Sequence, residues 1–145
     1  QALVTYSPVG FANRVTTGID KNRASMLIAV LEKKAGLSIQ SSDIFINVTG
    51  GLQIKEPACD LAILCALASS FKEIPVDFKT VLIGEVGLTG EIRGVNSIEK
   101  RLLEAKKMGF KRAVIAEANA EISKEVKNME IIPVNNIRQV MDIIF

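Results

Sequence analysis

The stretch from Glu56 to Ser70, EPACDLAILCALASS, places two ionisable side chains, Cys59 and Asp60, side by side where a helix is expected to begin. Proline is common at the first position of a helix, and a helix N-terminus lowers the pKa of a thiol. Cys59 is therefore a candidate nucleophile. The structural alternative is a core thiol, with Asp60 bonded to backbone amides or paired with a lysine such as Lys55.

The absence of histidine from all 145 residues excludes several kinds of active site. A Ser-His-Asp triad, a Cys-His pair and a zinc site of the HExxH type all need one. A general base near neutral pH would have to be a lysine or a carboxylate with a pKa shifted by its surroundings. No such base is evident for Cys59, so the structural interpretation of this stretch is preferred.

A second candidate site is the basic segment from Glu99 to Arg112. It holds six basic and two acidic residues, a net charge of +4 against +2 for the whole chain. It is either a solvated helix face or a surface that contacts the DNA backbone, which would need further basic residues on the same face. The candidate DNA-binding residues are Arg14, Lys21, Arg23, Arg93, Lys100, Arg101, Lys106 and Lys107. With one tyrosine and six phenylalanines, the chain favours contact with a duplex backbone over base stacking.

Hydrophobic periodicity and turn residues predict the elements that position these residues. Strands are expected over residues 2–6, 14–19, 43–48, 80–86, 88–95, 112–116 and 130–134. Helices are expected over residues 20–34, 57–71, 97–108 and 118–126, and from 135 to the end. Asp20, Asn96 or Ser97, and Asn135 are the expected N-caps, and Gly36 is an expected helix end. This order predicts a mixed α/β (α+β) domain with helices packed on one sheet.

Composition predicts one globular domain over residues 1–145, with 48% hydrophobic and 23% charged residues. No apolar run reaches the ~18 residues of a membrane span, so a cytoplasmic protein is expected. Two cysteines six positions apart on one helix cannot be bridged, and reduced thiols are expected. The glycines of GEVGLTGEIRG lack the spacing of a phosphate-binding loop and are better explained by turns. The chain starts without methionine, which indicates a domain of a longer protein.

Five stretches together resemble the C-terminal domain of the bacterial RadA (Sms) family of DNA repair and recombination proteins. They are QALVT, TTGIDKNRASMLIAVLEKKAGL, GGLQIKEPACDLAILCALASS, GEVGLTGEIRGVNSIEKRLLEAKKMGFKRAVIA and EIIPVNNIRQVMDIIF. That domain is similar to the proteolytic domain of Lon. The resemblance implies a two-layer fold of a mixed sheet and helices, like the second domain of ribosomal protein S5.

Lon-type proteases use a Ser-Lys dyad, so the matching positions decide whether this chain could share their chemistry. Their serine lies in a Pro-Ser-Ala-Gly stretch at a helix start, and their lysine follows the TGE hairpin in a Gly-Gly-Leu-Lys stretch. The resemblance puts Ala58 at the serine position and Glu99 at the lysine position, with TGEIRGV aligned without a gap. A methyl group cannot attack a carbonyl, and a carboxylate cannot replace the lysine. No catalytic residue is therefore expected.

The resemblance implies a non-proteolytic domain that assembles a ring and contacts DNA. The parent would be a RadA-type ATPase that drives branch migration in homologous recombination as a hexamer, with a RecA-type recombinase as a further partner. ATP, Mg and Zn would be held by a RecA-like motor and a zinc-binding motif outside these residues. No cofactor or metal is expected in this domain. The alternatives are a residual Lon-like peptidase that uses Cys59 and a protein-protein adaptor.

Overall fold

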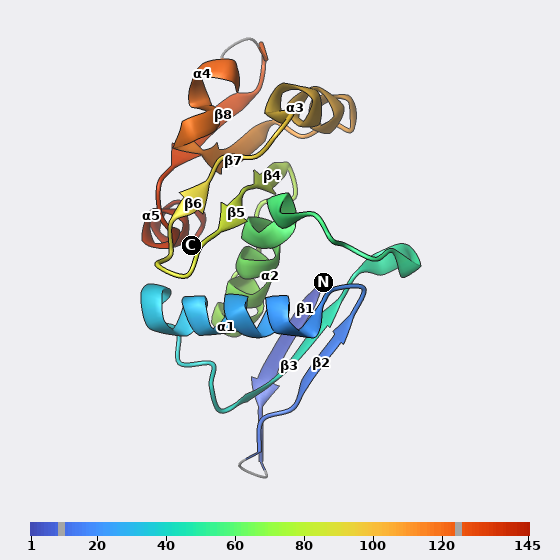
Figure 1. Cartoon of the computed structure of the whole chain (residues 1–145), viewed down its shortest axis with the longest axis vertical. Coiled ribbons are helices and arrows are strands. Elements are labelled where there is room, and N and C mark those ends of the chain that lie inside the picture. The colour runs from blue at the N-terminus through green and yellow to red at the C-terminus, as the bar shows by residue number, and fades with distance from the viewer. Residues whose placement is uncertain (9–10, 124–125) are drawn as a thin grey trace.

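The structure is a computed structural model that describes residues 1–8, 11–123 and 126–145 (Figure 1). The strands are β1 (Ala2–Tyr6), β2 (Arg14–Thr17), β3 (Ser42–Asn47), β4 (Thr80–Ile83), β5 (Glu85–Val86), β6 (Ile92–Arg93), β7 (Arg112–Ala116) and β8 (Glu130–Val134). The helices are α1 (Lys21–Ala35), α2 (Asp60–Lys72), α3 (Ile98–Lys107), α4 (Ala120–Ser123) and α5 (Ile137–Ile144). Short 3₁₀ turns cover Thr49–Gly51, Pro57–Cys59 and Glu117–Asn119.

The described strands form three small sheets, whereas the prediction was a single mixed sheet. The first sheet has the order β1-β3-β2, with β1 antiparallel and β2 parallel to β3. The second has the order β4-β7-β8 and is entirely parallel. The third is the hairpin of β5 and β6. The predicted mixed α/β class is confirmed, with the strands divided among separate sheets.

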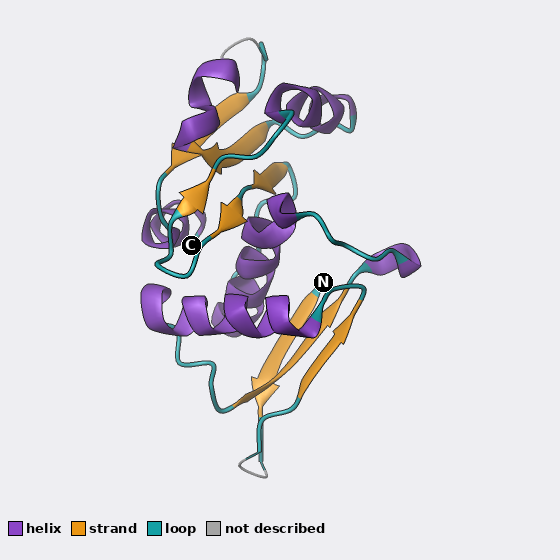
Figure 2. Cartoon of the chain, in the orientation of Figure 1, coloured by secondary structure: helices purple, strands orange, loops and turns teal. Residues whose placement is uncertain are grey.

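The helices connect the two larger sheets. Figure 1 shows the first sheet in the lower part of the molecule and β4-β7-β8 in the upper part, with α1 and α2 between them. Figure 2 shows α3 and α4 beside the upper sheet. Ile98 and Leu102 of α3 pack with Ala113 and Ile115 of β7 in a second, smaller apolar cluster.

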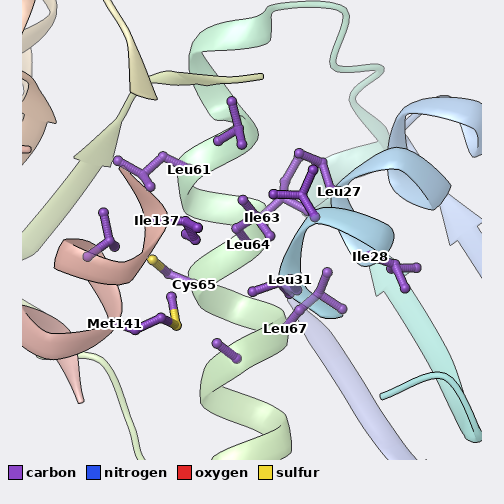
Figure 3. Packing of buried hydrophobic residues seen from close by; sticks show 14 of the residues in the cluster. Leu27, Ile28, Leu31, Leu61, Ile63, Leu64, Cys65, Leu67, Ile137 and Met141 are labelled. Atoms are coloured by element: carbon purple, nitrogen blue, oxygen red, sulfur yellow. The ribbon is translucent and has the colours of Figure 1, made fainter. Parts of the chain in front are cut away.

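Helix α2 is the centre of the larger core because its sequence is apolar on every side from Leu61 to Ala68. Figure 3 shows α2 between α1 and α5, with Leu27 on one side and Met141 on the other. The side chains of Leu61, Leu64 and Leu67 are fully buried. The predicted buried helix is confirmed and holds the two sheets together.

Local signals placed most helix ends correctly. Asp20 caps α1 as predicted, with its Oδ1 accepting a hydrogen bond of 2.9 Å from the Arg23 amide. Gly36 ends the same helix in the left-handed conformation, also as predicted. Ser97 precedes α3 but makes no side-chain cap bond. The cap of α5 is Asn136 rather than the predicted Asn135.

The strand predicted over residues 80–86 is interrupted at Gly84. The Gly84 amide donates to the Ala58 carbonyl at 2.9 Å, and the Gly84 carbonyl accepts from the Leu61 amide at 3.1 Å. A Cβ atom on Gly84 would lie 2.8 Å from Cγ2 of Ile92. The backbone of Gly84 therefore bonds to the start of α2 instead of continuing the strand, and β4 and β5 join different sheets.

Candidate functional site

The helix start singled out in the sequence is a 3₁₀ turn, Pro57–Cys59, that leads into α2. Ala58 is buried there and packs in the same cluster as Ile98 and Leu102 of α3. Its side chain is a methyl group among apolar neighbours, so this position offers no nucleophilic atom.

The stretches that carry the two dyad positions lie next to each other. Glu56 Oε1 accepts from the Ala58 amide at 3.2 Å, and Glu56 Oε2 accepts from the Arg101 guanidinium at 3.0 Å. Both hydrogen bonds lower the pKa of Glu56, and the bond from Arg101 has the larger effect. Glu99 lines a separate pocket of about 420 Å³ that does not include Ala58. The two positions are thus on adjoining segments but do not face one cavity, and the loss of the dyad stays a prediction.

Asp60 has a definite structural partner. Its carboxylate is 2% exposed and accepts from Nε of Arg23 at 2.8 Å, from the terminal nitrogen NH2 of Arg23, and from the Val86 amide at 3.1 Å. The hydrogen bond that Arg23 donates to Asp60 raises the pKa of Arg23. The expected bond to a backbone amide is present, but the cation is Arg23, not the Lys55 expected from the sequence. This pair joins the start of α2 to α1 and to β5.

A pocket of about 340 Å³ opens beside this ion pair. Its lining residues are Ile19, Asp20, Arg23, Ile54, Lys55, Glu56, Pro57, Asp60 and Ile63. None of them is a serine, threonine or cysteine, so the lining supplies no hydroxyl or thiol nucleophile. Its charged groups include Asp60 and Arg23, whose charges are already paired with each other.

The thiols are poorly suited to nucleophilic chemistry. Cys59 and Cys65 are both free, as the spacing predicted. Burial first, and then the Glu56 carboxylate, raises the pKa of Cys59, whereas an attacking thiolate needs a lowered pKa. Burial raises the pKa of Cys65 to about 12.

The eight predicted DNA-binding residues lie on four elements, β2, α1, β6 and α3. Arg14 lies on β2, and Lys21 and Arg23 lie at the start of α1, all near the first sheet. Arg93 lies on β6, and Lys100 and Arg101 lie in the first turn of α3. The last two of the eight, Lys106 and Lys107, lie in the last turn of α3.

Three of the predicted arginines are held in ion pairs. Arg23 is paired with Asp60, Arg101 with Glu56, and Arg93 with Glu91 at 2.5 Å. A DNA role for them stays a prediction, and it would have to compete with these carboxylates.

Lysines gather instead where the strands of the parallel sheet begin, around the last turn of α3. We call the following residues the lysine cluster: Lys79, Lys106, Lys107, Lys111 and Lys127. The Lys79 carbonyl accepts from the Lys111 amide at 2.8 Å, and Lys106 Nζ donates to the Lys127 carbonyl at 2.7 Å. A Cβ atom on Gly109 would lie 3.7 Å from Lys79 Nζ.

The sequence did not reveal this cluster because its members come from three segments. Parallel pairing brings the segments together, since Thr80, Arg112 and Glu130 are in register at the first position of each strand. Lys79, Lys107, Lys111 and Lys127 are exposed. Within the cluster Lys107 is paired with Glu104 at 2.6 Å, an exposed contact worth little in water.

Among the described residues, no group of three or more His, Cys, Asp or Glu side chains could hold a metal ion. In the same part of the chain, every helix is too short or too polar to cross a membrane.

The chain matches the model of a known family. Residues 5–119 match the model of the family described as subunit ChlI of Mg-chelatase, and the chain therefore belongs to that family.

Curated relatives extend the match to the whole chain. DNA repair protein RadA of Bacillus subtilis (strain 168) is 47% identical over 141 residues, which is 97% of this chain and 31% of that protein. RadA of Streptococcus pneumoniae is 45% identical over 145 residues, 100% of this chain and 34% of that protein. RadA of Halalkalibacterium halodurans is 41% identical over 99% of this chain and 31% of that protein. The resemblance to RadA proteins is confirmed, and the chain spans about a third of the length of these relatives.

Proposed function

We propose that this chain is a non-proteolytic domain of a RadA-type DNA repair protein, and that it contacts DNA through the lysine cluster. The parent would be an ATPase that acts in homologous recombination by branch migration, with ATP, Mg and Zn held outside these residues. The relatives named DNA repair protein RadA support the DNA repair role. The lysine cluster is the observation that supports DNA contact by this domain.

The cluster fits a polyanion because its five lysines outnumber the three neighbouring carboxylates, Asp77, Glu104 and Glu130. Five lysines converge there, and the carboxylate of Glu104 pairs with only one of them. Each lysine that neutralises a phosphate releases condensed counterions, so DNA affinity should fall steeply as salt rises. The paired arginines Arg23, Arg93 and Arg101 would first have to leave their carboxylates.

The test is DNA affinity as a function of salt for the wild type and for the double variant Lys107→Ala/Lys111→Ala. The variant should bind more weakly, and the slope of log affinity against log salt should decrease by about 2 on duplex DNA. Lys33→Ala is the matched control, because Lys33 is also an exposed lysine near the end of a helix. An unchanged slope in the double variant would remove the cluster from the proposal. Absence of any DNA affinity would favour the protein-protein adaptor.

Ring assembly is the second part of the proposal. Head-to-tail contacts between copies generate closed rings, and a hexamer is proposed for the parent. Light scattering should detect an assembly for the full-length protein, for this chain, or for both. A monomer in both cases at high concentration would defeat this part. A RecA-type recombinase is proposed as a partner on the family resemblance alone.

A residual peptidase is the less supported alternative. The raised pKa of Cys59 counts against it. Incubation with unfolded casein tests it directly. Turnover that is lost on Cys59→Ser substitution would establish the peptidase and overturn the non-proteolytic proposal.

A further inference from the structure

A rigid turn presents an exposed aromatic side chain beside the lysine cluster. The turn runs from Asp77 to Thr80, just before β4. Asp77 Oδ2 accepts from the Thr80 hydroxyl at 2.9 Å, and the Asp77 carbonyl accepts from the Thr80 amide at 3.0 Å. The turn is therefore fixed by its own hydrogen bonds, and Phe78 projects from it.

Phe78 is 80% exposed although it is a large apolar residue. Lys79 Nζ lies 5.1 Å from the centroid of its ring, which is within the range of a cation–π contact. Met108, at the end of α3 and next to Gly109, is also largely exposed. An aromatic ring held at the surface among lysines is the combination that single-strand binding proteins use, with charge along the backbone and a ring for the bases.

We propose that the lysine cluster and Phe78 together form a binding surface for single-stranded DNA, in which a base stacks on Phe78 and the lysines contact phosphates. This inference rests on the proposed DNA contact and names its substrate. In a duplex both faces of each base are already stacked, so an isolated exposed ring would gain nothing from it. The sequence favoured duplex binding because the chain has few aromatic residues, whereas the structure places Lys79, next to Phe78, beside Lys111.

The same chemistry of lysines and an exposed ring could also suit an anionic lipid surface. Single-stranded DNA is favoured because the patch offers one aromatic ring on a fixed turn, not an apolar helix face that could enter a bilayer. Vesicles that contain phosphatidylserine are therefore included in the test as a competing ligand.

The experiment measures the affinity of this chain for an oligothymidylate of about 15 nucleotides and for a duplex of equal length. Phe78→Ala should weaken binding of the oligothymidylate by about tenfold or more and leave duplex binding within about twofold. Phe11→Ala is the matched control, because Phe11 is 84% exposed and lies in the loop before β2, near the first sheet. It should bind both DNAs like the wild type. Since Phe78 is exposed, its truncation leaves the core intact.

Phe78→Trp provides a direct readout because the chain has no tryptophan. This variant should retain binding, and its fluorescence should be quenched by the oligothymidylate. Equal loss on both DNAs in Phe78→Ala, no loss, or no quenching in Phe78→Trp would overturn the inference while leaving DNA contact intact. Binding to the vesicles but not to the oligothymidylate would also overturn it. Absence of binding to either DNA would defeat the proposed function as well.

Discussion

The buried ion pair of Asp60 and Arg23 gives the sharpest prediction for stability. Arg23→Ala leaves the Asp60 carboxylate, 2% exposed, with the Val86 amide as its remaining hydrogen-bond donor. Removal of one partner of a fully buried pair costs about 3–5 kcal/mol. Arg23 is 31% exposed and a pocket adjoins the pair, so water can reach the carboxylate. The expected loss is therefore about 2–3 kcal/mol.

Asp60→Asn should cost less than Arg23→Ala. The asparagine is neutral and can still accept from the Val86 amide, while the partly exposed guanidinium of Arg23 can be hydrated. A loss of about 1 kcal/mol is expected. Arg23→Ala should cost more than Asp60→Asn because it leaves a buried charge without its partner, whereas Asp60→Asn leaves a charge that water can reach.

Urea unfolding at neutral pH measures both losses, and thermal unfolding should show about 2–4 °C per kcal/mol. Arg93→Ala is the control, because its ion pairs are exposed and should contribute less than about 1 kcal/mol. The reasoning is refuted if Asp60→Asn destabilises the protein as much as Arg23→Ala. It is also refuted if Arg23→Ala is no worse than Arg93→Ala.

Three further predictions concern a glycine, a carboxylate and a thiol. Gly18→Ala should destabilise the fold by at least about 2 kcal/mol more than Gly50→Ala, as measured by urea unfolding. Both glycines have a positive φ, but a Cβ atom added at Gly18 would lie 2.5 Å from a backbone carbonyl oxygen, whereas one added at Gly50 would meet no atom within 4 Å. A hydrogen bond from the Thr89 side chain lowers the pKa of Glu91 to about 2. The stabilisation by Glu91 is therefore present above its ordinary pKa of 4.5 and is lost as pH falls towards 2, so Glu91→Gln should show a smaller loss in acid unfolding curves. Cys59 should react with iodoacetamide more slowly than a free thiol at neutral pH; faster reaction would contradict its raised pKa.

The sequence could predict the features that depend on near neighbours in the chain. The predicted Asp20 cap and Gly36 helix end are both confirmed, because each depends only on residues of α1 next to it in the chain. The interruption at Gly84 could not be predicted, since it depends on hydrogen bonds to the start of α2, more than twenty residues away. The sequence likewise suggested the nearby Lys55 as the partner of Asp60, because the actual partner, Arg23 on α1, is distant in the chain.

The lysine cluster shows the same limit for the candidate site. A net charge of +4 between Glu99 and Arg112 indicated a basic region correctly, but charge along the chain does not give a surface. Of the further arginines predicted outside this segment, Arg23 and Arg93 are paired with carboxylates, and so is Arg101 within it. Only the parallel register of β4, β7 and β8 brings Lys79 beside Lys111.

The charged residues of EPACD can be accounted for without catalysis. Glu56 connects the start of α2 to α3 through Arg101, and Asp60 connects it to α1 through Arg23 and to the β5 backbone. These contacts join α1, α3 and β5 to the start of α2. A substitution of Glu56 or Asp60 should therefore affect stability and the placement of α3 before it affects any reaction. This explains why ionisable groups occur at this helix start without any catalytic role.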